Sequence, residues 1–427
     1  MSLIKVSDLT QPLYADQTES ASTDHEEIKT TPNVSCRQRI FSCLFSSSRK
    51  AEISLLSSGC IGAGFYCLDF LFRECGLILG SIIFTTTGLT FVYFQDVIRW
   101  GLNSTHESNL MTMIYHLYGK RTRKFMKICL GLSIFGLLCS NQAFAAGFFK
   151  EILFTASSYQ IENNYYQMLL NFCLVLIVLA LGVFKQKTII KYFSVVCWIS
   201  VFYLTSIVLV QIPFYFEGII EMLTESKPIT INAGFADSAT VVVYTFHALF
   251  TIPMAYENFK KGAYAATESM KYAQFGFSCI LFSILFLFYY YNSIAESLST
   301  EANWLLIIAK MLFIIILTVN TVINLHQFAM MVVDIFPCIS FSPTSYFLIK
   351  LLICIHLGVC AYFFSIPFTY YKVIGGTTVI LFDIIIPTLV YWNVSNNYPV
   401  VISISLWSVL LILLGVSSAS YAFTGLS

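Results

Sequence analysis

The chain has 427 residues, of which 57% are hydrophobic and only 11% are charged. Soluble domains carry about 25% charged residues, so this composition predicts a protein with many membrane-spanning helices. A formal net charge of +1 gives no basis for nucleic-acid binding, and the 13 cysteines form neither a disulfide framework nor a CxxC metal pattern. We therefore expect buried thiols, the lipid bilayer as a partner, no metal and no cofactor.

Residues 1–50 differ from the rest of the chain. They are polar, rich in Ser, Thr, Asp and Glu, and contain no apolar stretch near 18 residues. The segment also lacks the basic start and apolar core of a signal peptide. We expect residues 1–50 to be a disordered cytosolic tail and residues 51–424 to form a transmembrane domain.

The apolar segments of residues 51–424 are long enough to span a bilayer, which takes about 20 residues. This length criterion predicts eleven helices, near 53–72, 76–98, 126–149, 167–184, 192–213, 238–257, 275–294, 303–329, 345–365, 373–392 and 400–421. The fold class is therefore an all-α integral membrane protein. Because the connection at 73–75 is short, the first two helices should be antiparallel neighbours.

Basic residues give the orientation, because cytosolic loops are rich in Lys and Arg. With the N-terminus in the cytosol, 16 Lys and Arg residues of the tail and loops fall inside, and four fall outside. The outer four are Arg73, Lys150, Lys227 and Lys372. We expect a cytosolic N-terminus and a C-terminus on the opposite side.

The first predicted span contains a stretch, residues 58–69, whose composition disfavours a continuous helix. Gly59, Gly62 and Gly64 each cost about 1 kcal/mol relative to alanine in a helix interior. Asp69 follows, and an acid near the bilayer centre costs about 2.5–3.5 kcal/mol. Irregular backbone at membrane depth is tolerated where it is buried in protein or lines a cavity, so this stretch predicts a binding site.

A second interruption lies five helices later, where Thr245, Phe246 and His247 precede Pro253 inside an apolar run. Paired interruptions in two halves of a chain are the best sequence indication of a transporter site. An offset of five helices inverts the second half relative to the first. The pattern predicts a 5+5 inverted repeat with an eleventh helix appended.

Three groups of residues together carry a family resemblance. They are Gly62, Gly64, Gly76 and Gly80; Phe246, His247, Pro253 and Glu257; and Ile366, Pro367, Gly375, Ile386 and Pro387. In this order they resemble the amino acid/auxin permease family over about residues 50–420. The resemblance implies the leucine-transporter-like fold of the amino acid–polyamine–organocation transporters, in which helices 1 and 6 unwind at the substrate site and helices 3 and 8 complete it.

On this resemblance the substrate site is predicted to contain Gly59, Gly62, Ala63, Gly64, Thr245, Phe246, His247 and Asn141. Free amides at 62–64, at the positive end of a half-helix, suit a carboxylate. Carbonyls freed on helix 6 suit an ammonium group or a coupling cation. Both charged groups of a free amino acid would then be bound by backbone.

Ion-coupling candidates are Ser58, Asp69, Thr318 and Thr321. Sodium-coupled members of the family often carry asparagine where this chain has Ser58, so proton coupling or exchange is favoured over sodium. Many members have proline where this chain has Asp69. The alternative to a coupling role is that Asp69 is a solvent-exposed acid at the outer end of helix 1.

Several polar residues of the spans also have structural interpretations. Interhelical hydrogen bonding is an alternative for Asn141 and Gln142, and packing is one for His247. Lys310 and Lys350 are expected to extend to an interface. Asp383 and Glu257 are interpreted as structural partners or gates.

These observations favour secondary transport of free amino acids by alternating access. The alternative is an amino acid sensor that uses the same pocket without net transport. An enzyme is not expected, because the chain contains neither HExxH nor GxSxG. The predicted location is the plasma membrane or a vacuolar or lysosomal membrane.

Overall fold

The computed structural model describes residues 68–107, 110–157, 164–184, 235–245, 304–336, 342–363, 380–394 and 398–424, with single positions at 189, 196, 199, 200, 203, 206 and 377. All elements in these ranges are helical. They are α3 (Leu68–Thr105), α4 (Leu110–Ser157), α5 (Asn164–Gly182), α8 (Phe235–Thr245), α11 (Trp304–Ile335), α12 (Pro343–Phe363), the π-helix η5 (Leu381–Ile385), α14 (Ile386–Val394) and α15 (Tyr398–Thr424).

Helix α3 contains a sharp break at Gly76, directly after the predicted connection at 73–75. Gly76 has φ 75° and ψ 171°, a backbone region that is essentially restricted to glycine. The helix then continues to Thr105, beyond the predicted end at 98. It stops there because His106 takes a left-handed conformation, which lets the amide of Glu107 bond the carbonyl of Leu102 at 3.0 Å.

Helix α4 begins much earlier than the predicted span at 126–149. Residues 110–118, which we expected in a cytosolic loop, are helical, and a second glycine break follows at Gly119 with φ 84° and ψ 179°. The expectation was wrong because this short piece is apolar on one side. Leu110, Met111, Met113 and Ile114 are all buried.

The other described helices lie close to their predicted spans. Ser342 caps α12, because its Oγ accepts the amide of Ser345 at 3.0 Å and Pro343 occupies the first helical position. Residues 1–50 and most of the predicted spans 53–72, 192–213 and 275–294 lie outside the described residues. The predicted count of eleven spans, the inverted repeat and the division at residue 50 therefore remain predictions.

The described part of the predicted tenth span is a π-helix, 381–385, followed by an α-helix, 386–394, and Pro387 explains the change. Proline lacks an amide hydrogen, and its ring clashes with the carbonyl four residues earlier, here that of Asp383. The wider turn of η5 relieves the clash, and the amide of Ile386 bonds the carbonyl of Leu381 instead. Such π-turns often accompany functional sites.

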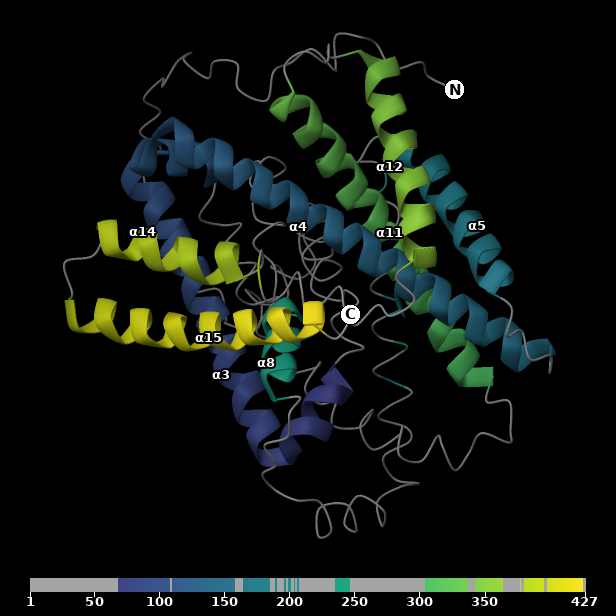
Figure 1. Cartoon of the computed structure of the whole chain (residues 1–427), viewed down its shortest axis with the longest axis horizontal. Helices are drawn as coiled ribbons and strands as arrows, with labels where there is room; N and C mark the ends of the chain where they lie inside the picture. Colours follow the sequence, from purple (N-terminus) through teal and green to yellow (C-terminus); the bar gives the residue numbers. More distant parts are fainter. Residues whose placement is uncertain are drawn as a thin grey trace, which may run out of the picture.

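The helices pack in two groups. Helices α4, α5, α11 and α12 pack on one another, and α3, α8, η5, α14 and α15 pack on one another. Figure 1 shows α4 reaching from the α3 and α14 side of the molecule across to α11, α12 and α5. The first piece of α4 belongs to the α3 group, whereas residues beyond Gly119 run along α11.

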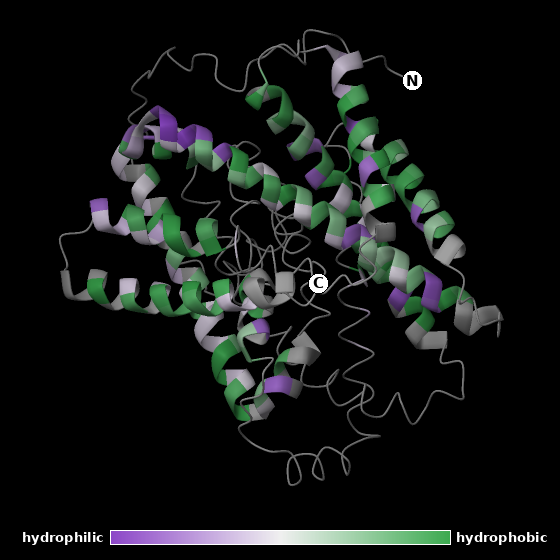
Figure 2. Ribbon diagram, in the orientation of Figure 1, coloured by the Kyte–Doolittle hydropathy of each residue, from purple (hydrophilic) through white to green (hydrophobic). Residues whose placement is uncertain are grey.

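Two helical segments of the described chain are long and apolar enough to cross a membrane, Leu110–Leu153 and Lys310–Val333. Shorter apolar helices cover Ile78–Phe91, Met168–Gly182, Pro343–Val359 and Ser408–Ser418. Figure 2 shows the hydrophilic residues of α4 gathered near its two ends, with a mostly hydrophobic length between them. This distribution is typical of a membrane-spanning helix.

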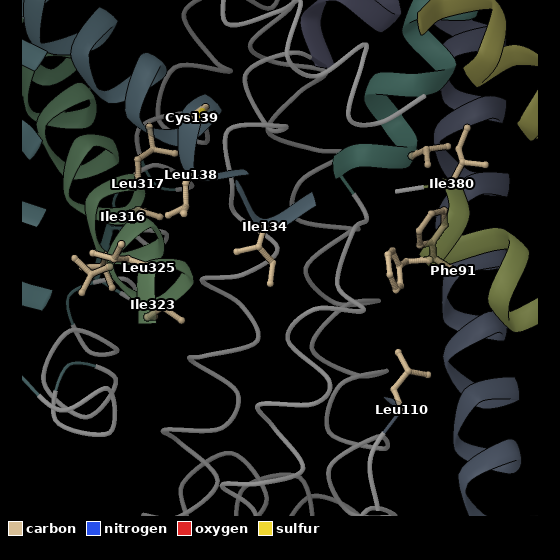
Figure 3. Close-up of a cluster of buried hydrophobic side chains, with 14 of the residues drawn as sticks. Phe91, Leu110, Ile134, Leu138, Cys139, Ile316, Leu317, Ile323, Leu325 and Ile380 are labelled. Atoms are coloured by element: carbon tan, nitrogen blue, oxygen red, sulfur yellow. The ribbon is translucent and has the colours of Figure 1, made fainter. Parts of the chain in front are cut away.

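Buried apolar side chains connect the helices of both groups. Figure 3 shows Leu138 of α4 near Ile316 and Leu317 of α11 on one side, and Phe91 and Ile380 on the other. Leu110, at the start of α4, lies on the same side as Phe91. The buried apolar core thus extends through both packing groups.

Candidate functional site

Helices α4 and α11 run antiparallel in a register that printed contacts define. The contacting pairs, ordered along α4, are Gly131 with Met331, Phe135 with Phe328, Phe148 with Phe313, and Glu151 with Lys310. Each step forward along α4 matches about one step backward along α11. Asn141, which lies between Phe135 and Phe148, is therefore level with residues 320–322.

This level carries buried polar side chains on both helices. They are Ser140, Asn141 and Gln142 on α4, and Thr318, Asn320 and Thr321 on α11. Three predicted site residues, Asn141, Thr318 and Thr321, thus come from the middle of one helix pair. Thr321 donates its hydroxyl to the carbonyl of Leu317 at 2.8 Å, which leaves its oxygen lone pairs available as acceptors.

Asn141 has a buried side-chain oxygen without a hydrogen-bond partner in the described structure. Its side chain is 2% exposed, and its Oδ1 forms no hydrogen bond within the described structure. A buried polar atom without a partner costs about 1–3 kcal/mol, so it needs a reason to be retained. A ligand that donates a hydrogen bond to Oδ1 would supply one.

Gln142 has the structural role that we considered for it. Its Nε2 donates to Oδ1 of Asn171 on α5 at 2.9 Å, and Nδ2 of Asn171 donates to the carbonyl of Gly358 on α12 at 3.0 Å. The two amides therefore join α4, α5 and α12. Sequence analysis missed Asn171, although a lone amide inside the apolar segment 167–184 was a visible signal.

The other half of the predicted site cannot be placed. Ser58, Gly59, Gly62, Ala63, Gly64, Phe246 and His247 lie outside the described residues. Asp69 and Thr245 lie in α3 and α8, but only their backbone is described. The unwound helices 1 and 6, and a role for Asp69, therefore remain predictions.

The expectation for the two lysines was wrong in one case. Lys350 does not extend to an interface: it is 4% exposed, and its Nζ lies 2.7 Å from the carbonyl oxygen of Gly182 and 2.9 Å from Nδ1 of His326. The inward direction follows from the fold, because the carbonyl of Gly182 at the end of α5 accepts a hydrogen bond from Lys350 of α12. Lys310 forms an ion pair with Glu151 at 2.8 Å.

A buried carboxylate that sequence analysis did not select lies in the first turn of α8. Oδ1 of Asp237 accepts a hydrogen bond from Oγ of Ser418 on α15 at 2.6 Å, and both residues are buried. Asp237 just precedes the predicted sixth span, so it was read as part of a loop. The contact fixes the start of α8 against the last helix.

Four polar contacts between helices join ends that the predicted orientation assigns to the same membrane side. On the predicted inner side these are Asn393 with Tyr118 and Lys350 with Gly182. On the outer side they are Glu151 with Lys310 and Asp237 with Ser418. The helix packing is thus compatible with the orientation read from Lys and Arg.

Comparison with solved structures shows what this fold is similar to, whereas comparison of the sequence does not. No family profile and no curated protein matches the sequence. The fold is similar to a crystal structure of the Eremococcus coleocola manganese transporter, solved with an aromatic bis-isothiourea substituted compound. The TM-score is 0.60 at 13% identity, over 96% of this chain and 92% of that chain.

The fold of this chain is similar to that of a membrane transporter. This similarity covers nearly the whole chain, and it agrees with the apolar helices described above. At 13% identity it shows the fold and not the substrate. Within the described residues, no group of three or more His, Cys, Asp or Glu is arranged to hold a metal ion.

Proposed function

We propose that this protein is a secondary transporter of free amino acids that works by alternating access. The observation that carries the proposal is the buried polar level between α4 and α11, in a chain whose fold is that of a membrane transporter. The level lies at the middle of both helices, where transporter sites are found.

The chemistry of the level suits a small zwitterion. Oδ1 of Asn141 is an acceptor without a described partner, and an ammonium group carries three donors. The hydroxyl oxygens of Thr318 and Thr321 offer further acceptors on the facing helix. In this proposal the substrate carboxylate binds the free amides predicted at 62–64, which the resemblance to amino acid/auxin permeases implies.

Proton coupling or exchange is proposed over sodium coupling, because Ser58 replaces the asparagine that sodium-coupled relatives often carry. A coupled proton must bind the inward-open and outward-open states with different affinity, since only differential affinity moves the equilibrium between them. The proposed location remains the plasma membrane or a vacuolar or lysosomal membrane.

Two other functions compete with this proposal. Transport of a divalent metal ion is favoured by the name of the structural neighbour, a manganese transporter. An amino acid sensor would use the same pocket without net transport. The substrate panel below separates all three.

The purified full chain, reconstituted in liposomes, tests the proposal. Uptake of each of the twenty radiolabelled amino acids and of Mn²⁺ is measured under an imposed proton gradient, an imposed sodium gradient, and no gradient. We expect saturable uptake of one or a few amino acids that the proton gradient increases. Uptake of Mn²⁺ alone would show the metal transporter, and amino acid binding without uptake would show the sensor.

Asn141 offers a prediction that separates function from stability. We expect Asn141→Leu to reduce amino acid uptake at least tenfold, because the substrate loses an acceptor, while the melting temperature stays equal or rises as a buried unpaired amide is removed. Ser133→Ala is the matched control, since Oγ of Ser133 is also buried and unpaired on α4 but lies two turns away. Equal uptake by Asn141→Leu and wild type would remove Asn141 from the site.

A further inference from the structure

A buried basic cluster lies where the ends of α5, α11 and α12 meet. Nζ of Lys350 bonds the carbonyl of Gly182, contacts Nδ1 of His326, and lies 4.2 Å from the ring centre of Tyr346. The hydroxyl of Tyr346 donates to the carbonyl of His326 at 3.0 Å. Three helices therefore share one cationic centre.

The contact between the two nitrogens constrains their protons. Nζ and Nδ1 are 2.9 Å apart, and Nδ1 also lies 3.3 Å from the hydroxyl oxygen of Tyr346, which donates its own hydrogen to the carbonyl of His326. A hydrogen between Nζ and Nδ1 is bonded to one of these nitrogens, and the other must accept it. Lys350 and His326 cannot both carry a full positive charge in this geometry. The pair holds either one excess proton, on the lysine or the imidazole, or none.

The second nitrogen of the imidazole is buried. His326 is 5% exposed, and within the described residues its Nε2 has no partner at full hydrogen-bond geometry, while the backbone of Phe184 interacts with the ring. Whichever of the two ring nitrogens lacks the hydrogen can bind one. Nε2 is therefore a second place at which the pair can hold a proton.

No carboxylate whose side chain is described pairs with the positive charge of the cluster; on α11, Asp334 lies eight residues beyond His326, and only its backbone is described. On α12 the titratable neighbours are Tyr346 and the buried thiol of Cys354. The last turn of α5 has no charged side chain, and its carbonyls supply the partial negative charge of a helix end. Residues 119–130 of α4, the part near the predicted inner side, carry only cations, at Lys120, Arg121, Arg123, Lys124 and Lys127.

We propose that Lys350 and His326 form a proton-binding site that couples proton movement to the packing of α5, α11 and α12. The inference rests on the proposed transport function, for which it supplies the proton site. It replaces neither Thr318 nor Thr321: His326 lies five residues beyond Thr321 on α11, about 7.5 Å along the axis. The cluster is therefore near the substrate level but separate from it.

The proton step balances with the groups present. In the protonated state Lys350 is an ammonium that caps Gly182, and His326 is neutral with hydrogen on Nε2. On release, a Nζ–H bond breaks and a Nδ1–H bond forms, while the Nε2–H bond breaks and its proton passes to a water molecule. Because Nε2 is buried in this structure, water reaches it only when α5 moves away from α11 and α12. Lys350 is then a neutral amine that accepts from Nδ1–H, and its attraction for the end of α5 is weakened.

The Lys350→Arg variant distinguishes a proton-binding role of Lys350 from a purely structural role in capping the end of α5. Arginine keeps a permanent cation for the carbonyl of Gly182 but cannot give up its proton. His326→Gln is the second variant, because glutamine accepts from Lys350 without binding a proton. Lys310→Arg is the matched control, at the ion pair with Glu151 at the other end of α11.

Two measurements are made on the reconstituted full chain: substrate exchange without a gradient, and accumulation driven by a proton gradient. The wild type and Lys310→Arg should show both. Lys350→Arg and His326→Gln should keep exchange within about twofold and lose at least tenfold of the gradient-driven accumulation. Gradient-driven accumulation at the wild-type level in both variants would show that Lys350 is only a cap.

A readout without substrate distinguishes failure of this inference from failure of the proposed function. The melting temperature of the purified proteins is measured between pH 5 and 9. The wild type and Lys310→Arg should share a pH-dependent step that Lys350→Arg lacks. Absence of amino acid exchange in the wild type would overturn the proposed function, whereas identical melting profiles for all variants would overturn the proton site.

Discussion

At Gly101 of α3, neighbouring helices approach so closely that no side chain fits. A Cβ atom added there would lie 2.5 Å from Cγ1 of Val390 on α14 and 2.9 Å from Sδ of Met113 on α4. Gly147 on α4 is the opposite case, since no described atom lies within 4 Å of its added Cβ. The two glycines thus provide a matched pair.

We expect Gly101→Ala to destabilise the protein by about 1–3 kcal/mol, because overpacking forces helices apart. Gly147→Ala should be neutral or stabilising by up to about 1 kcal/mol, as alanine favours a helix. Thermal melts of the detergent-solubilised chain measure both. In the double variant Gly101→Ala/Val390→Ala, the second substitution should recover part of the stability lost by the first. If Val390→Ala recovers nothing, the strain does not come from the contact between these two positions.

Single residues show what sequence analysis can and cannot find. The break at Gly76 was predictable, because a short polar connection separated two apolar runs. The crowding at Gly101 was not, since it depends on Val390, almost 300 positions away. Lys350 was misjudged for the same reason: its partners come from two other helices.

At the scale of helices, the amides of Gln142 and Asn171 join α4, α5 and α12 through two buried hydrogen bonds. We expect Asn171→Leu to cost about 1–3 kcal/mol, because it leaves the Gln142 amide and the Gly358 carbonyl unpaired. Thermal melts of Asn171→Leu, Gln142→Leu and the double variant form a cycle. The coupling should be about 0.6–1.7 kcal/mol, the range measured between membrane helices, and strictly additive effects would contradict the contact.

Helix positions were predictable because about 20 apolar residues must cross a bilayer, whatever their neighbours. The ends of α5, α11, α12 and α15 accordingly fall near the predicted ones. Residues 110–118 escaped prediction because their apolar face is too short to span, and because basic residues just beyond Gly119 resemble a loop. The π-turn before Pro387 had a visible cause, yet the sequence alone allowed a kink there equally well.

For the whole molecule, α4 is the element shared by both packing groups, and Gly119 divides it. Met113 and Tyr118 contact α3 and α14, whereas residues from Gly131 to Glu151 contact α11. If the two groups move relative to each other during transport, the change in backbone angle concentrates at Gly119.

We expect Gly119→Ala to lower the maximal rate of amino acid uptake severalfold while leaving KM unchanged. Alanine has room there, since no described atom lies within 4 Å, but the backbone region costs a non-glycine residue about 1–3 kcal/mol. Uptake kinetics in proteoliposomes measure the effect, with Gly147→Ala on the same helix as the control. An unchanged rate would show that the groups do not pivot at this position.

The overall architecture was predictable as helical, and its fold proved to be similar to that of a solved manganese transporter. The polar level between α4 and α11 was predictable in part, because Asn141, Thr318 and Thr321 interrupt apolar runs. These three residues lie at the same level only because of the antiparallel register of two helices about 180 residues apart in sequence. No local pattern contains that register.

The breaks at Gly76 and Gly119 have a consequence for finding relatives of this chain. Most positions on its helices need only an apolar side chain, so two chains can share a similar fold at low identity, as this chain and the manganese transporter do at 13%. The two breaks are more constrained, because their backbone angles strongly favour glycine. A search for two glycines spaced 43 positions apart, the first at the start of a long apolar run and the second followed directly by basic residues, should recover homologues that overall identity conceals.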